Sequence, residues 1–323
     1  MLRYFNTPII QIAIAINMVL MSLLLYDTVY PAESILGKKP RYGLLVSVSS
    51  VPNRKAIGTR IWVPGLDDGF VPQGMTFAED QILISLYRST DVKIDTGPSK
   101  VYRVDPNTGD VTGQFQLPSD VGHADGLAYA GNNVLYVADS VGLDSTRSRK
   151  IYKLDSEKAV RQGNSNESIL GKIIVDRSMG PAFITYDGKY LWFGQYTKSK
   201  SDMPKMYKIK PDDVFKEWPA IGQVSPNMAL FSFEIAVESQ GATFDKDGYL
   251  WLSQSGSKMG KLQKVDPSNG KVLKEYELMA GLEDLATAPD GKLWSVSEAG
   301  TKRWLNWQTF YPLIFEIDIT KLK

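Results

Sequence analysis

The feature that most constrains the fold is a sequence motif that recurs along the chain. Each copy places a small or acidic residue, here called the pivot, ten positions ahead of a bulky apolar residue; the pivots are Gly74, Gly126, Gly241 and Asp284. The four copies are VPQGMTFAEDQILISLY (71–87), HADGLAYAGNNVLYVAD (123–139), ESQGATFDKDGYLWLSQ (238–254) and GLEDLATAPDGKLWSVS (281–297). A spacing of roughly 40 to 60 residues indicates one structural unit built several times.

A fifth copy, GPAFITYDGKYLWFGQ (180–195), keeps the bulky residue as Trp192 but has Pro181-Ala182 in place of the pivot. Between pivot and bulky residue, three copies carry Asp-Gly, at 187–188, 247–248 and 290–291. Asp-Gly is favoured in two-residue hairpin loops, because Gly accepts a positive φ at little cost. Short apolar runs flank each of these turns, so every copy is predicted to begin with a β-hairpin.

A third strand is predicted after each hairpin. In KVYRVDPNTGDV (100–111), Tyr102 and Val104 share one face and Arg103 lies on the other, as in a half-buried strand. The turn DPNTG (105–109) then leads into a fourth apolar run, VTGQFQL (111–117). The repeating unit is therefore four short antiparallel strands.

Five such units predict an all-β chain folded as a β-propeller of four-stranded blades, because radial repetition closes the sheets into a ring and protects their edges. The last copy ends after three strands, and GTRIWVPG (58–65) is predicted to supply its outer strand. Five blades are favoured. Six blades are the alternative, with a degenerate blade near residues 42–66 or 214–236.

The N-terminal region has a different character. Residues 8–26, PIIQIAIAINMVLMSLLLY, carry no charge and are long enough to cross a bilayer as a helix. We expect an uncleaved membrane anchor, a signal-anchor helix, in region 1–34. A linker and first strand follow in 35–57, and the propeller occupies 58–323. A cleaved signal peptide and a secreted form are the alternative. Either places the propeller outside the cytoplasm, on a periplasmic or extracellular face.

Composition excludes several function classes. The chain has 37 basic and 36 acidic side chains, a net charge of +1, and no basic run interleaved with aromatics, so nucleic acid is not an expected partner. It contains no Cys, which excludes disulfides, thiolate metal sites and Cys nucleophiles. One His, His123, and no Cys argue against a zinc site.

The register of the repeat predicts a polar pocket. Side chains alternate along a strand, so residues one and three positions before a pivot point the same way. We therefore predict a polar collar at one mouth of the central channel, formed by Gln73, His123, Asp125, Glu238, Gln240 and Glu283. Polar residues that follow the second strand of a copy are assigned to strand caps or to the opposite mouth. They are Asp139, Gln195, Gln254 and Glu298.

Three chemical interpretations of the collar remain open. In the first, the collar side chains hydrogen-bond to water buried in the channel, and Gln73 and Gln240 only line it. Asp125, Glu238, Glu283 and Asp284 could instead hold Ca²⁺, which prefers hard oxygen ligands. Finally, His123 or Asp125 could act as a general acid or base.

The motifs themselves resemble those of uncharacterised exported bacterial β-propellers. These are VPQGMTF, GHADGLAY, FITYDGKYLWFGQY, SQGATFDKDGYLWLSQS and EDLATAPDGKLWSVSEAG. Such propellers are loosely similar to the gluconolactonase-like and strictosidine-synthase-like superfamily. In the gluconolactonase-like group a divalent cation is held in the channel by acidic and amide side chains. The resemblance therefore implies Asp125, Glu238 and Glu283 as cation ligands.

These observations lead to one functional prediction with two alternatives. We expect a membrane-anchored propeller that binds a small molecule or a membrane-associated protein partner at the channel mouth. A Ca²⁺-dependent hydrolase of the lactonase or arylesterase type is the first alternative. The second is a structural module that docks a membrane complex through GTKRWLNWQTFYP (300–312), where Trp304 and Trp307 either pack over the ring closure or lie at a bilayer surface.

Overall fold

The computed structural model describes residues 35–42, 51–94, 97–141, 146–307 and 310–323. Residues Leu36–Lys323 form one compact unit, and the following account concerns that unit. The predicted membrane segment, 8–26, lies outside the described residues. Within the described part of the chain, no helix is both long enough and apolar enough to cross a membrane.

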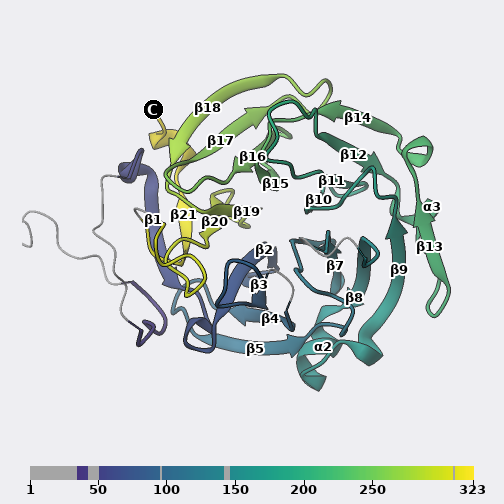
Figure 1. Cartoon of the computed structure of the whole chain (residues 1–323), viewed down its shortest axis with the longest axis horizontal. Helices are drawn as coiled ribbons and strands as arrows, with labels where there is room; N and C mark the ends of the chain where they lie inside the picture. The colour runs from purple at the N-terminus through teal and green to yellow at the C-terminus, as the bar shows by residue number, and fades with distance from the viewer. Residues whose placement is uncertain (1–34, 43–50, 95–96, 142–145, 308–309) are drawn as a thin grey trace, which may run out of the picture. The chain divides into compact units, whose positions relative to one another are not determined.

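The unit is a five-bladed β-propeller (Figure 1), which confirms the predicted fold class and blade number. From the innermost strand outward, blade 1 is β2 (Phe70–Ala78), β3 (Gln81–Arg88), β4 (Ser99–Val104) and β5 (Val111–Gln116). Blade 2 is β6 (Gly126–Tyr129), β7 (Val134–Asp139), β8 (Lys150–Asp155), β9 (Ile169–Val175) and β13 (Ile221–Val224). Blade 3 is β10 (Phe183–Tyr186), β11 (Leu191–Gly194), β12 (Lys205–Ile209) and β14 (Phe231–Glu234). Blade 4 is β15 (Ser239–Phe244), β16 (Leu250–Gln254), β17 (Gly260–Val265) and β18 (Val272–Leu278). Blade 5 is β19 (Leu282–Thr287), β20 (Leu293–Ser297), β21 (Leu313–Ile317) and β1 (Ile57–Trp62).

Blade 5 is completed by the two ends of the propeller sequence. Strand β1 pairs antiparallel with β21, with Ile61 opposite Ile314 and Trp62 opposite Leu313. This is the closure predicted for 58–65. The segments considered for a sixth blade instead supply outer strands of the five: β1 in blade 5, β13 in blade 2 and β14 in blade 3. Strand β13 is an addition, since it pairs parallel to β9 as a fifth strand.

Short helices lie in the connections between strands. Helix α2 (Ser156–Gln162) follows β8 and is capped by Asp155, whose side chain accepts from the backbone N–H of Lys158 at 2.9 Å. Helix α3 (Pro211–Val214) is a single turn that begins with Pro211, a residue suited to the first helical position. Neither interrupts a blade.

The Gly pivots allow the innermost strands to approach one another closely. A Cβ atom at Gly74 would lie 2.7 Å from the backbone carbon of Gly126, and one at Gly126 would lie 2.7 Å from the backbone nitrogen of Ile184. Distances below 3 Å are too short for a real Cβ, so a side chain would push neighbouring blades apart. The innermost strands β2, β6, β10, β15 and β19 contact one another in this order and close the ring.

The predicted hairpin turns form at the other end of the innermost strands. Gly188, Gly248 and Gly291 have φ angles of +92°, +82° and +84°, in the region that glycine adopts without strain. In blade 3 the indole N–H of Trp192 donates to Asp187 at 2.8 Å; in blade 4 that of Trp251 donates to Asp245 at 2.9 Å. We call this side of the propeller the turn end.

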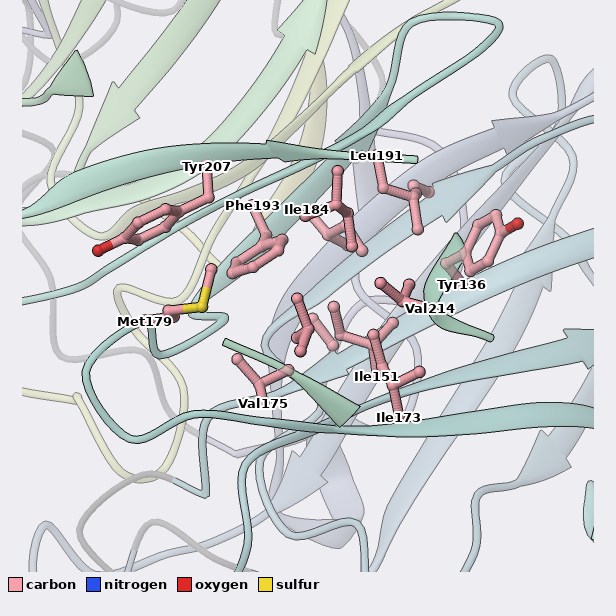
Figure 2. Close-up of a cluster of buried hydrophobic side chains, with 14 residues drawn as sticks. Tyr136, Ile151, Ile173, Val175, Met179, Ile184, Leu191, Phe193, Tyr207 and Val214 are labelled. Atoms are coloured by element: carbon pink, nitrogen blue, oxygen red, sulfur yellow. The ribbon is translucent and has the colours of Figure 1, made fainter. Parts of the chain in front are cut away.

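The core lies between blades rather than within one. Figure 2 shows the cluster between blades 2 and 3, where Tyr136, Ile151 and Ile173 of blade 2 face Ile184 and Phe193 of blade 3. All of these side chains are buried. Each blade therefore depends on its neighbours for the burial of its apolar faces, which fixes the relative positions of the loops at both ends.

Candidate functional site

The innermost strands begin at a pocket opposite the turn end. It has a volume of about 510 Å³, and every blade contributes to its walls. The lining includes Gln73 and Tyr87 of blade 1, His123, Asp125 and Ser140 of blade 2, Gln195 and Tyr196 of blade 3, Glu238, Gln240 and Ser255 of blade 4, and Glu298, Arg303 and Trp304 of blade 5. We call it the mouth pocket.

The structure brings together most of the predicted collar. Five of its six members, Gln73, His123, Asp125, Glu238 and Gln240, line the mouth pocket. Glu283 lies just behind the lining, since it is buried and its Oε1 accepts from Ser255 Oγ at 3.2 Å. Asp284 is placed elsewhere, at the contact between innermost strands.

One part of the sequence interpretation needs correction. Gln195 and Glu298, assigned to strand caps or the opposite mouth, line the same pocket as His123 and Asp125. The reason is the antiparallel hairpin: the second strand runs back, so the residues that follow it lie beside those that precede the first. Ser140, after β7, and Ser255, after β16, reach the pocket in the same way.

His123 and Asp125 form a hydrogen-bonded pair in the pocket wall. Asp125 Oδ1 lies 2.8 Å from His123 Nδ1 and accepts from Ser140 Oγ at 2.7 Å. Its Oδ2 accepts from the backbone N–H of Ser140 at 2.6 Å. The His123 ring also lies against the Tyr87 ring, with centroids 4.3 Å apart. Asp125 thereby sets the orientation of the imidazole and the tautomer with a proton on Nδ1.

A buried ion pair holds the loop that carries this pair. Asp139 Oδ1 accepts from the backbone N–H of His123 at 3.0 Å, and Asp139 Oδ2 accepts from Lys150 Nζ at 2.9 Å. Asp139 is fully buried and Lys150 is 2% exposed. The loop needs such support because Ala124, between His123 and Asp125, has a φ of +55°.

Left-handed backbone recurs around the pocket. Besides Ala124, the non-glycine residues Val141 and Glu238 have φ angles of +66° and +60°. Val141 follows the pocket residue Ser140, and Glu238 itself lines the pocket. A β-branched residue such as Val141 rarely adopts this conformation, and strained backbone tends to occur at functional sites.

Two glutamates of blade 5 form a buried carboxyl pair. Glu283 and Glu298 are 1% and 5% exposed and interact directly through their side chains. Burial raises the pKa of Glu283 well above its usual range, and the neighbouring charge of Glu298 raises it further. Burial also raises the pKa of Glu298, against the hydrogen bond from Glu283 and the charges of Arg303 and His123. Two adjacent carboxyls in a buried site disfavour ionisation of both at once, so burial and the neighbouring charge favour one shared proton.

Residues 303–307 contribute directly to the pocket. Trp304 and Trp307 line it with ring centroids 4.2 Å apart, and Trp304 Nε1 donates to Glu298 Oε2 at 2.7 Å. Arg303 is 8% exposed and lies between the rings of Tyr87 and Trp304, 5.4 and 4.8 Å from their centroids. Its guanidinium donates to Tyr87 OH and to the Val92 carbonyl. The two tryptophans are therefore part of the site, a role that the sequence interpretation missed.

Asp284 has a structural position on the axis of the ring. Its Oδ2 accepts from the backbone N–H of Met75 at 2.9 Å and of Leu127 at 3.3 Å. Its Oδ1 accepts from those of Ala242 at 3.3 Å and Leu285 at 2.9 Å. One carboxylate thus joins the innermost strands of blades 1, 2, 4 and 5. Burial raises its pKa, and the four N–H donors act in the opposite direction.

The residues predicted as Ca²⁺ ligands do not fit a shared cation. No group of three or more His, Asp or Glu side chains able to hold a metal occurs in the described part of the chain. Both oxygens of Asp284 are used by backbone N–H groups, and Asp125 is used by His123 and Ser140. Glu283 faces Glu298 instead. These carboxyl groups are already engaged in hydrogen bonds within the protein, and they do not converge on one position where a cation could bind.

Comparison with known proteins gives structural likeness alone. No protein-family model matches the sequence, and no curated protein matches it either. Among solved structures, glutaminyl cyclase of Myxococcus xanthus is similar over 81% of this chain and 94% of its own, with a TM-score of 0.51 and 12% identity.

Two further solved structures show a weaker likeness. The PQQ-bound aldose sugar dehydrogenase of Streptomyces coelicolor is similar over 75% of this chain and 80% of its own, with a TM-score of 0.40 and 16% identity. A glucose dehydrogenase-type oxidoreductase of Thermus thermophilus is similar over 76% and 96%, with a TM-score of 0.43 and 15% identity. The glutaminyl cyclase comparison agrees with the resemblance seen in the sequence motifs at the level of the fold: the chain is a β-propeller.

Proposed function

We propose that the propeller binds a small polar organic molecule in the mouth pocket. The observation that carries this proposal is the pocket itself: all five blades direct charged, amide or aromatic side chains into one cavity of about 510 Å³. Ligand pockets of enzymes and binding proteins commonly have such a volume and such convergent polar groups. The left-handed Ala124, Val141 and Glu238 support the same conclusion, since residues other than Asn and Gly rarely adopt this conformation and these three lie in or beside the pocket wall.

The location that accompanies this function is also a proposal. Residues 8–26 would anchor the protein in a membrane, with the propeller on the extracytoplasmic side, and the uncharged sequence of that segment supports this. Fractionation of cells that express the full chain and a chain lacking residues 1–34 tests it. Release of the shortened chain from the membrane fraction is expected; retention in that fraction would contradict anchoring by this segment.

Ligand binding is tested by thermal unfolding in the presence of small organic acids, amines and amino acids. A molecule that binds the folded state raises the melting temperature, and the rise grows with the ratio of its concentration to its dissociation constant. The variant Trp304→Ala/Trp307→Ala should lose this response, because both rings line the pocket. Trp218→Ala is the matched control, since Trp218 is 38% exposed and lies outside the pocket lining. Equal responses in both variants would argue against the pocket.

An enzymatic function is the second candidate, and the Glu283–Glu298 pair favours it. Glu298 lines the pocket, and its hydrogen bond with Glu283 favours the ionised form of Glu298. A carboxylate whose pKa is raised by burial is suited to accept a proton from a nucleophile and return it to a leaving group. Glu298 would be the catalytic residue and Glu283 a positioning residue.

Two reactions match this arrangement. In lactone hydrolysis, water adds to the ester carbon while Glu298 takes its proton; the ring C–O bond then breaks and the alkoxide receives that proton. In cyclisation of an N-terminal glutamine, the amine adds to the side-chain amide carbon, Glu298 takes one proton from nitrogen, and ammonia leaves with it. Each sequence returns Glu298 to its ionised state. The second reaction is included because a glutaminyl cyclase shares the fold.

The enzymatic candidate is tested with simple lactones and with a peptide that begins with glutamine. Glu298→Gln should reduce turnover at least about a hundredfold, as expected for loss of a general base. Glu275→Gln, on an exposed outer strand, is the matched control. Turnover of neither substrate by the native protein would exclude these two reactions, while ligand binding would still stand on the thermal assay.

A further inference from the structure

A short segment that precedes the propeller strands lies against the loop that forms one wall of the mouth pocket. We call residues 36–42 the strap. The strap lies outside the five repeat units, in the region that the sequence analysis assigned to a linker. The wall in question belongs to blade 5, and we call its pocket residues the blade 5 wall: Glu298, Arg303, Trp304 and Trp307.

The strap begins as an addition to the outer edge of blade 5. The backbone N–H of Leu36 donates to the Arg60 carbonyl at 2.9 Å, and the Leu36 carbonyl accepts from the Trp62 N–H at 2.9 Å. Leu36 is thereby paired parallel to β1. Gly37 then passes close to blade 1, since a Cβ atom on Gly109 would lie 2.4 Å from the Gly37 nitrogen. The start of the strap is therefore bonded to blade 5 and packed against blade 1 through its backbone.

The strap ends on the loop that follows β20. Tyr42 OH donates to the carbonyl of Gly300 at 3.0 Å, and Lys302 Nζ lies 5.6 Å from the centroid of the Tyr42 ring. Burial raises the pKa of the Tyr42 phenol, and the charge of Asp67 raises it further, so the hydroxyl keeps its proton and remains a donor. Tyr42 therefore joins the strap to the loop through one hydrogen bond and one contact between an ammonium group and a ring.

Asp67 joins the same two segments from the side of blade 1, where it lies in the short helix η2 (Leu66–Asp68). Its carboxylate accepts from the backbone N–H of Arg41 at 2.8 Å and from Arg41 Nε at 3.2 Å, and its backbone carbonyl accepts from Lys302 Nζ. The Arg41 side chain is 83% exposed, so its ion pair with Asp67 contributes little. The backbone of Arg41 and the side chain of Tyr42 therefore provide most of the attachment.

Inside the loop, Gly300 is linked directly to residues of the blade 5 wall. The Gly300 N–H donates to the Trp304 carbonyl at 3.2 Å, and the N–H of the next residue, Thr301, donates to the Glu298 carbonyl at 3.2 Å. Trp304 Nε1 in turn donates to Glu298 Oε2 at 2.7 Å. A displacement of Gly300 would therefore change the positions of both Glu298 and Trp304.

We propose that the strap positions the mouth pocket: Tyr42 holds Gly300 in place, and through it Glu298 and Trp304. Tyr42 is thus a positioning residue that lies outside the pocket lining and outside the repeats. This inference goes beyond the proposed function, because it concerns the shape of the blade 5 wall whichever ligand binds there. Separation of the strap from the loop should open this wall without a change to any residue of the lining.

The first test measures the opening of the loop with a thiol probe. Thr301 is fully buried, and its Oγ1 has no hydrogen-bond partner in the described part of the chain, so Thr301→Cys should be tolerated. The native chain contains no cysteine, so reaction with dithiobis(nitrobenzoate) reports this position alone. Tyr42→Phe should accelerate the reaction about threefold to tenfold, as expected for the loss of one hydrogen bond that opposes local opening. Tyr42→Ala should accelerate it more, because the ring contact with Lys302 is also lost.

The second test uses the protein without an added cysteine. The indole N–H resonance of Trp304, identified by its absence in Trp304→Phe, reports the hydrogen bond to Glu298, and it should shift in Tyr42→Ala. Tyr249→Ala is the matched control. Tyr249 also has an ammonium group over its ring, with Lys264 Nζ 3.9 Å from the centroid, but it lies outside the lining of the mouth pocket. Neither the thiol reaction nor the Trp304 resonance should change in this control.

The outcomes separate this inference from the proposed function. A faster thiol reaction together with a shifted Trp304 resonance in Tyr42→Ala supports the strap, whereas an unchanged value of either one overturns it. An equal response in Tyr249→Ala also overturns it, because the response would then reflect a general loss of stability. Both measurements are made without a ligand. The proposed function fails separately, if no molecule of the panel gives a thermal response that depends on Trp304 and Trp307.

Discussion

The two ends of the innermost strands differ in how far their side-chain contacts repeat from blade to blade. At the turn end, blades 3 and 4 repeat the same contacts: Trp192 donates to Asp187 at 2.8 Å, and Trp251 donates to Asp245 at 2.9 Å. Lysines follow the repeat too, with Lys208 4.7 Å from the Trp192 ring and Lys264 5.6 Å from the Trp251 ring.

At the mouth pocket the same repeat positions are occupied by different residues. The position before the pivot is Gln73, Asp125, Pro181, Gln240 and Glu283 in blades 1 to 5. Identical contacts in successive blades serve the blade itself, because each blade has the same hairpin to stabilise. Different side chains around one cavity give a site without fivefold symmetry, as an asymmetric small molecule requires. The comparison predicts that turn-end changes affect stability alone, whereas pocket-end changes affect stability and binding together.

The largest effect is expected from Lys150→Met. The methionine fills a similar volume but leaves the buried carboxylate of Asp139 without its cation, which costs about 3 kcal/mol of the free energy of unfolding. Because Asp139 holds the His123 loop, binding at the mouth pocket should weaken as well. Urea denaturation and calorimetric titration measure the two effects. A stability loss with unchanged binding would show that the loop keeps its shape without the ion pair.

A smaller effect is expected from Trp251→Phe at the turn end. The substitution removes the N–H donor to Asp245 and part of a buried ring, and should cost about 1–2 kcal/mol. Trp192→Phe should cost a similar amount, since its contact is the same. Ligand dissociation constants should not change in either variant. A change in both would mean that the turn end influences the mouth pocket through the blade.

The smallest effect is expected from Glu283→Gln, and its size depends on pH. Since burial raises the pKa of Glu283 in the folded state, its protonated form is favoured there, and this contribution is complete below the unfolded pKa of about 4. It is lost as the pH rises through the folded pKa. Glutamine cannot ionise, so the variant should be more stable than the native protein at pH 8, by about 1 kcal/mol for each pH unit between the unfolded and the folded pKa, with the difference vanishing near pH 4.

A second glutamate, Glu275, provides a control for this pH dependence. Glu275→Gln, on the exposed part of β18, should show no gain of stability at pH 8. The pKa of Glu275 is lowered by Lys261, so its ionised form is favoured in the folded state. A loss of stability at pH 8 in Glu283→Gln would contradict the raised pKa, because it would mean that the ionised form of Glu283 is favoured in the folded state.

Much of the fold follows from local sequence. Asp-Gly pairs specify hairpins because of glycine's freedom at positive φ, and the repeat of pivot and bulky residue specifies the number of blades. The closing strand at 57–62 could be predicted because an unpaired three-stranded blade at the C-terminus requires a partner. Five of the six collar residues also reached the mouth pocket, because they lie at or just before the start of an innermost strand: Gln73 and Gln240 are in strands, and His123, Asp125 and Glu238 precede them.

Only the tertiary structure decided what those residues do. Asp284 and Glu283 are neighbours in the sequence, yet one binds four backbone N–H groups of the ring and the other pairs with Glu298. Trp304 and Arg303 reached the site from a loop with no counterpart in the repeat. The sequence by itself determined the blades, because hairpins and strands depend on neighbouring residues. The pocket chemistry depends on side chains from five separate blades, and their distances exist only after the ring has closed.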